Sequence, residues 1–172
     1  MEGKRLELRL PAPLVVPMLD FLLPLAAETG TAALAFEPDL EAIEADFRDD
    51  WRADIAAHVE GDLGCFIRVF DTEEFRENGV AEFGERECEP LLRAASALRL
   101  KLRNRRLTAV ADSVLEAGEI DFARLNKDER IAITAYMLLA SLQEIVIRHL
   151  DPSDEEEAGD EAEDEDEEVG EE

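Results

Sequence analysis

The chain has 172 residues, of which 44 are acidic and only 18 are lysine or arginine, so its formal net charge at pH 7 is -26. A charge of this sign and size disfavours free binding to nucleic acid and to anionic membranes, so neither is expected as a partner. The apolar content of 46% is enough for the hydrophobic core of one domain of about 150 residues.

The first predicted elements are a short strand and an apolar helix. Residues 5–10 alternate leucine with polar side chains, which is typical of a strand, although the pattern does not identify the strand's partner. A helix is predicted over 13–28 and ends before Gly30. Pro17 and Pro24 lie inside this helix, and each removes a backbone donor that the helix would otherwise use.

A long amphipathic stretch follows. Its apolar residues recur every three or four positions and so form one helical stripe: Leu40, Ile43, Phe47, Trp51, Ile55, Val59, Leu63, Phe66 and Phe70. We expect Asp49 and Asp50 to cap a second helix near Trp51, and Trp51 itself to be a core anchor. The end of the stretch, 65–70, is predicted as helix, with a strand that pairs with 5–10 as the alternative.

The next predicted unit begins after a turn at Asn78-Gly79. Its first helix has an apolar stripe formed by Cys88, Leu91, Leu92, Ala95, Leu98 and Leu102. A shorter helix is predicted at about 108–117, and Gly118 would end it.

The last predicted helix, 127–150, has the strongest signals at its ends. Asn126 and Glu129 have the spacing of a capping box, and Pro152 closes the other end. Its seam consists of Ile131, Ala135, Leu138, Leu142 and Ile145. We therefore predict a mainly α, single-domain bundle of about five helices around this central C-terminal helix, with a short N-terminal strand or hairpin. A homodimer through the 127–150 helix is the alternative use of the seam.

The same helix is not expected to span a membrane, because its apolar run is shorter than about 20 residues and contains polar side chains. Residues 154–172, by contrast, contain fourteen acidic residues and no lysine or arginine. We expect a disordered polyacidic tail at 153–172 after a helical domain at 1–152, because such a segment cannot bury apolar area. The tail would bind a basic protein partner or only keep the protein soluble.

The order of several short motifs resembles that of a known family. These motifs are RLELRL at 5–10, FRDD at 47–50, EGDL at 60–63, LR at 92–93, LRL at 98–100 and LQE at 142–144. They resemble a family of small, mainly helical bacterial proteins of unknown function, whose genes are often found beside that of the Clp protease adaptor ClpS. The resemblance implies a cytoplasmic bacterial protein connected with regulated proteolysis and carries no catalytic residue. The prolines of the first helix and the acidic tail depart from the family's pattern.

Five basic residues stand close together in this acidic chain: Arg99, Lys101, Arg103, Arg105 and Arg106. They can form an anion- or partner-binding surface, or they can be cations at a helix C-terminus that pair with acidic neighbours. A nucleic-acid-associated regulator that uses the helix 93–106 is an alternative function. No aromatic residue is interleaved with the bases, so the stacking found in single-strand binders is missing.

Residues for catalysis or metal binding are few. The chain has two histidines, His58 and His149, and two cysteines, Cys65 and Cys88, without a paired CxxC or HxxxH motif. We expect reduced thiols, with the pKa of Cys88 raised by the glutamates on both sides of it. Nucleophile elbows and phosphate loops are absent from the sequence. The predicted function is a non-enzymatic cytoplasmic protein-interaction domain, an adaptor or regulator without a cofactor; a small metal-binding or enzymatic bundle is the other alternative.

Overall fold

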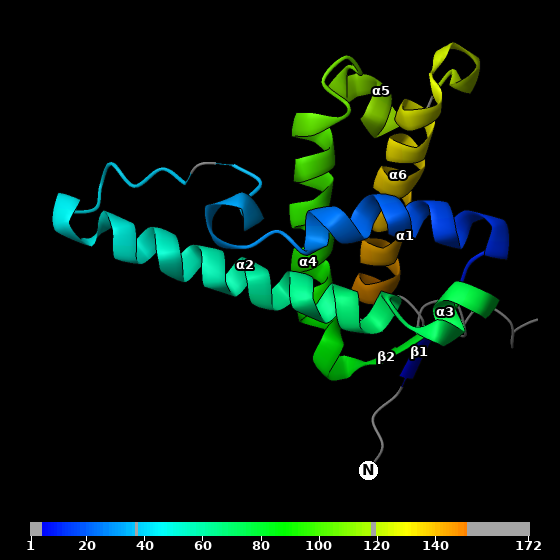
Figure 1. Ribbon diagram of the computed structural model, residues 1–172, viewed down its shortest axis with the longest axis horizontal. Coiled ribbons are helices and arrows are strands. Elements are labelled where there is room, and N and C mark those ends of the chain that lie inside the picture. The colour runs from blue at the N-terminus through cyan, green and yellow to red at the C-terminus, as the bar shows by residue number, and fades with distance from the viewer. Residues whose placement is uncertain (1–4, 37, 118–119, 151–172) are drawn as a thin grey trace, which may run out of the picture.

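Helices dominate the computed structural model, which describes residues 5–36, 38–117 and 120–150 (Figure 1). In this part of the chain the elements are β1 (Arg5–Arg9), α1 (Ala12–Ala26), α2 (Arg48–Phe70), α3 (Glu73–Asn78), β2 (Val80–Gly84), α4 (Glu85–Arg105), α5 (Asp112–Ala117) and α6 (Lys127–Leu150). Short 3-10 turns occur at Gly30–Ala33, Ala45–Phe47 and Phe122–Arg124. The predicted mainly α class, with a short N-terminal strand, is confirmed. The tail 153–172, Pro152 and Gly118 lie outside the described residues.

The partner of the first strand, which the sequence pattern left open, is β2. The two strands pair antiparallel, with Leu8 opposite Ala81. Both of these residues are buried, so the inward face of the small sheet joins the core. Gly79, with φ of 71°, ends α3 in the left-handed conformation, and its carbonyl accepts a hydrogen bond from the backbone N–H of Leu10 at 2.8 Å. The alternative strand at 65–70 is wrong, because these residues form the last turns of α2.

The helix at the centre of the bundle is α4. It packs against α2 on one side and α6 on the other. In Figure 1, α1 runs across α6 and reaches α4, and it contacts both helices. Its fully buried apolar residues are Cys88, Leu91, Ala94, Ala95, Leu98 and Leu102. Because α4 packs against both α2 and α6, it takes the central position that was predicted for the last helix.

The last helix, α6, covers α4 and α1 with one face. Its buried residues are Ala132, Ile133, Ala135, Leu139, Leu142 and Val146. This stripe is rotated from the predicted seam: Ile145 is 39% exposed, whereas Val146 is fully buried. Its ends agree with the prediction, and the capping box is present, since Asn126 Oδ1 accepts from the N–H of Glu129 at 2.9 Å and Glu129 Oε2 accepts from the N–H of Asn126 at 3.0 Å.

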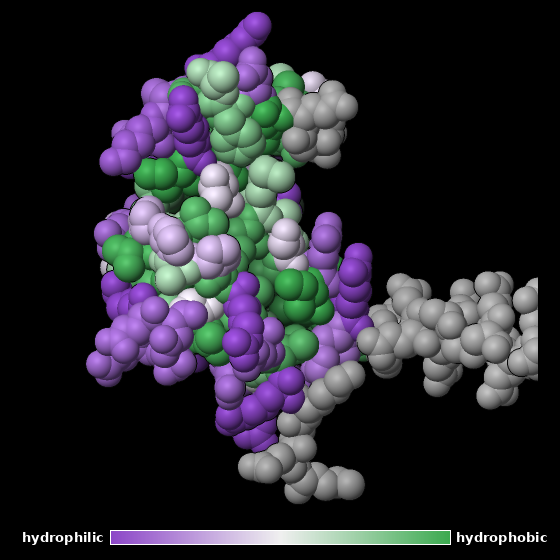
Figure 2. Space-filling model, turned by 90° about the vertical axis from the view of Figure 1, so that its right-hand side faces the viewer, coloured by the Kyte–Doolittle hydropathy of each residue, from purple (hydrophilic) through white to green (hydrophobic). Residues whose placement is uncertain are grey.

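By length and composition alone, α6 is the one helix in the described ranges that is long and apolar enough to span a membrane. About a third of its apolar window, 33%, is buried inside the fold. In the fold, α6 packs against α4 and α1. Figure 2 shows the face at the start of α1, where hydrophobic residues gather between hydrophilic ones. On α1 itself, Leu14 and Val16 are 44% and 43% exposed.

The N-terminal half of α2 and the segment before it project from the body (Figure 1). We call residues 38–55 the arm. Of the helical stripe predicted for this region, Leu40 at its start and Leu63, Phe66 and Phe70 at its end are buried, whereas Phe47 and Trp51 between them are exposed. Trp51 is 52% exposed, so its prediction as a core anchor is wrong. The stripe thus extends beyond the core at the start of α2.

Candidate functional site

Two of the five predicted basic residues hold the fold together. The side chain of Lys101 is fully buried, and its Nζ donates to Glu28 Oε2 and to the carbonyl oxygen of Leu25, both at 2.9 Å. Arg105 donates to the other oxygen of Glu28 at 2.6 Å. Burial raises the pKa of the Glu28 carboxyl, but the hydrogen bonds from Lys101 and Arg105 outweigh it and hold that pKa below its usual range. Lys101 and Arg105 thus bind a carboxylate of their own chain.

Arg103 and Arg106 have different surroundings. Arg103 donates from Nε to Asp112 Oδ1 and from Nη1 to the carbonyl oxygen of Leu107, so it ties α4 to the start of α5. The guanidinium carbon of Arg106 lies 5.7 Å from the centre of the ring of Phe21, which is on α1. The reading of these bases as cations paired with acidic neighbours therefore holds for Lys101, Arg103 and Arg105.

Arg99 differs from the others because its partners are neutral. It donates from Nη1 to Gln143 Oε1 at 2.7 Å and from Nη2 to the Tyr136 hydroxyl at 3.0 Å, both on α6. Its guanidinium carbon also lies 4.5 Å from the centre of the Tyr136 ring. The Nε–H is buried and has no hydrogen-bond partner. Among the residues that the structure describes, no carboxylate lies within ion-pair distance of Arg99.

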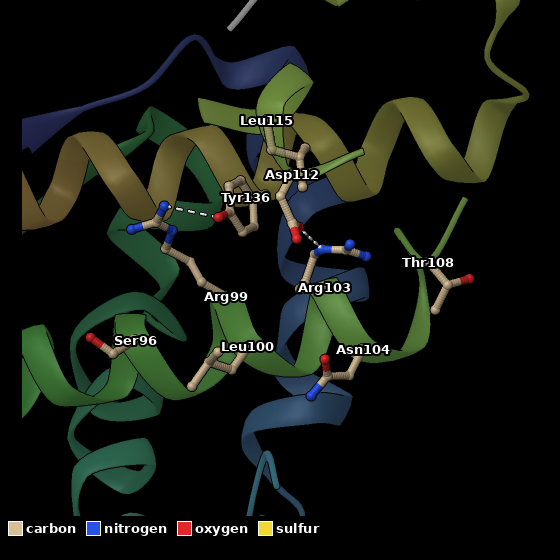
Figure 3. A pocket seen from close by; sticks show the side chains of 9 residues that line it. All are labelled: Ser96, Arg99, Leu100, Arg103, Asn104, Thr108, Asp112, Leu115 and Tyr136. Atoms are coloured by element: carbon tan, nitrogen blue, oxygen red, sulfur yellow. Dashed lines mark hydrogen bonds and ion pairs between the residues drawn. The ribbon is translucent and has the colours of Figure 1, made fainter. Parts of the chain in front are cut away.

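Arg99, Arg103 and Tyr136 border an open cleft of about 780 Å³ along α4 (Figure 3). Its lining consists of Ser96, Arg99, Leu100, Arg103, Asn104, Thr108, Asp112, Leu115 and Tyr136. In Figure 3, Arg99 and Arg103 extend from α4 toward the Tyr136 and Asp112 side of the cleft, with Ser96 at one end and Thr108 at the other. The cleft therefore combines two guanidinium groups, three hydroxyls, one amide and one carboxylate, and the guanidinium groups can hold an anion.

The sequence pattern predicted this site only in part. It predicted one anion- or partner-binding surface from five bases, and the structure brings only Arg99 and Arg103 of them into the cleft. Lys101 points to the opposite side, toward α1. Tyr136 and Asp112 were missed. Tyr136 is the only tyrosine of the chain, but nothing local in the sequence indicates that α6 packs it beside Arg99.

Both cysteines are free and buried. Burial raises the pKa of both the Cys65 and the Cys88 thiols, and for Cys88 the charges of Glu87 and Glu85 raise it further. Of the two flanking glutamates in the prediction, Glu87 raises the pKa of Cys88 and Glu89 is not among the causes; burial is the larger cause. In the part of the chain that is described, no three His, Cys, Asp or Glu side chains form a group that could hold a metal ion.

Comparisons of this chain with protein-family models, curated proteins and solved structures give no match. The resemblance to the family found beside ClpS therefore stays a prediction.

Proposed function

We propose that this protein is a non-enzymatic, cytoplasmic protein-interaction domain, and that the cleft between α4 and α6 binds a carboxylate carried by a protein partner. The observation that carries the proposal is the state of Arg99: a permanent positive charge with neutral partners and a buried N–H donor that is unused. Gln143 and Tyr136 take two of its five N–H donors, so donors remain for a ligand.

A carboxylate suits this cleft for two reasons. A guanidinium binds a carboxylate with two parallel hydrogen bonds, and hydrogen bonds to charged groups contribute more than neutral ones. Leu100 and Leu115 offer apolar contact beside the guanidinium. A short acidic segment of a protein supplies both kinds of contact.

The nucleic-acid alternative has less support. A polyphosphate backbone needs several free cations along one face. On α4, however, Arg93 donates to both oxygens of Asp62 at 2.8 and 3.0 Å, and Lys101, Arg103 and Arg105 pair with carboxylates. Phosphates would have to displace each of these partners in turn.

The proposal is tested with the isotopically labelled full chain and a short, blocked tetraglutamate peptide as the probe. We expect amide shifts at the residues that line the cleft, and about ten-fold weaker binding for Arg99→Gln because charge-assisted hydrogen bonds are lost. Arg86→Gln is the matched control, since Arg86 is an exposed arginine at the start of the same helix. Equal weakening by both variants, or shifts that avoid the cleft, would contradict the proposal.

A further inference from the structure

The arm carries a row of exposed apolar side chains on one face of α2. Phe47 and Trp51 are 54% and 52% exposed, and they stand four residues apart, so they are neighbours on the helix surface. Ile55 and Val59, both half-buried, continue the row at the same spacing. From Phe47 to Val59 this row is about 18 Å long, or a little over three helical turns.

The row leads into a groove between α2 and α4. This groove has a volume of about 630 Å³ and is lined by Ile55, His58, Val59, Asp62, Arg93 and Ala97. The exposed row and the groove thus form one continuous apolar surface, of the kind that receives the apolar face of an amphipathic helix.

The arm is held in place by its own hydrogen bonds. Arg48 donates from Nε to the carbonyl oxygen of Ile43 at 2.9 Å and from Nη2 to that of Glu41 at 3.2 Å, which ties the segment before α2 to its first turn. Asn104 of α4 donates to the carbonyl oxygen of Ala35 at 3.0 Å, just before the arm. The apolar row is therefore presented on a supported element.

The negative charge of the arm indicates what kind of partner would bind there. Residues 38–55 contain seven acidic side chains, all exposed, against two arginines, both half-buried. Arg48 is bound to backbone carbonyls and Arg52 pairs with Asp49, so they leave the negative charge of the arm largely uncompensated. Asp50 and Asp54 lie one turn from Phe47 and Trp51 respectively, beside the apolar row.

We infer that the arm and the adjoining groove bind a basic amphipathic helix of a protein partner. Its apolar side chains would cover Phe47, Trp51 and Ile55, and its lysines or arginines would face Asp50 and Asp54. Cations near the exposed Trp51 ring would gain a further favourable contact. A second copy of this chain would instead place two acidic arms together, which like-charge repulsion opposes. This surface is separate from the carboxylate-binding cleft and does not depend on it.

The inference is tested with the full chain and a peptide of about 14 residues made of leucine and lysine. The two residue types are placed so that a helix carries the leucines on one face and the lysines on the other. Trp51 is the only tryptophan, so its fluorescence reports on this surface alone. We expect a blue shift of its emission, amide shifts over 47–59, and binding about five-fold weaker for the double variant Asp50→Asn/Asp54→Asn. The control is Glu73→Gln/Glu77→Gln, which removes the same charge from exposed positions on α3.

Each outcome decides the inference. Weakening confined to the arm variant, together with shifts over 47–59, supports it. Shifts confined to other residues, or equal weakening by the α3 control, would mean that the peptide binds by net charge alone and would overturn it. A Trp51 emission that changes with protein concentration, without peptide, would assign the surface to a second copy and would also overturn it. Circular dichroism of both variants verifies that the helices are intact.

Discussion

The buried pair between Lys101 and Glu28 allows a quantitative test of how the basic end of α4 is used. Glu28→Gln would leave the ammonium of Lys101 fully buried, facing a carbonyl and a neutral amide. Breaking a buried ion pair typically costs about 3–5 kcal/mol. The Glu28 side chain is 25% exposed, and solvent screens part of the interaction, so we expect a loss of about 2–3 kcal/mol. For a domain of this size the midpoint of thermal unfolding would fall by about 4–12 °C.

Lys101→Met separates the charge from the packing, since it keeps a long unbranched side chain. It leaves Glu28 paired with Arg105, so we expect a loss of about 1 kcal/mol. The double variant Lys101→Met/Glu28→Gln has no unpaired buried charge and should be about as stable as Lys101→Met alone. Urea unfolding at pH 7, followed by circular dichroism, gives the coupling energy, expected near 2 kcal/mol. Additive losses in the double variant would refute this account of the pair.

The pH dependence provides a second measurement of the same pair. Against the effect of burial, the hydrogen bonds from Lys101 and Arg105 hold the pKa of Glu28 in the folded state below the value of about 4.3 found in unfolded chains. The stabilisation is therefore complete above the unfolded pKa and is lost as pH falls through the folded pKa. The difference in unfolding free energy between the wild type and Glu28→Gln should shrink below about pH 4. If this difference in unfolding free energy stayed constant down to acid unfolding, the negative charge of Glu28 would not be the source of the stabilisation.

Two substitutions and one labelling experiment test the fold further. Gly79→Ala places a Cβ 2.1 Å from the carbonyl oxygen of Leu10 at a positive φ, so urea unfolding should show a loss of more than about 2 kcal/mol; an unchanged midpoint would contradict the assigned conformation. Asn126→Ala removes the cap of α6 and should lower the unfolding free energy by about 1 kcal/mol, without changing the helix content at 25 °C. Cys65 and Cys88 should react with iodoacetamide far more slowly in the folded protein than in urea, since both thiols are buried; rapid labelling without denaturant would argue against their burial.

The sequence was informative wherever the signal is local. The capping pair Asn126 and Glu129 predicted the start of α6, and the helix spans the predicted residues 127–150. Asn78-Gly79 predicted the turn before β2 for the same reason, because the side chain and backbone that make the feature are neighbours in the chain. Helices with a regular apolar stripe, such as α4, were predicted equally well.

Long-range features were not predictable in the same way. The strand at 5–10 pairs with residues about 75 positions later, and the short segment 80–84 has too weak an alternation to be recognised alone. Periodicity also indicates which face of a helix is apolar but not whether another element covers it, which is why Trp51 was expected in the core. Likewise, the compensation of Lys101 by Glu28 depends on where α1 ends relative to α4.

For the candidate site, the sequence identified five basic residues as candidates, and the fold shows which of them pair with carboxylates. Five bases at 99–106 were equally plausible as ligands in the sequence. The distribution of carboxylates in space singles out Arg99, because Glu28 and Asp112 reach the bases around it and α6 brings only Tyr136 and Gln143 to it. Such a distinction requires the positions of groups that are far apart along the chain.

The pairing of β1 with β2 has a consequence for how the protein is made. The first strand leaves the ribosome about 75 residues before its partner, which at roughly 5–20 residues per second is an interval of about 4–15 s. During that interval Leu8 and the apolar side of α1 have no completed surface to join. The core around α4 closes only when α6, the last described element, has been synthesised. Early termination anywhere before residue 127 should therefore leave a nascent chain that depends on chaperones.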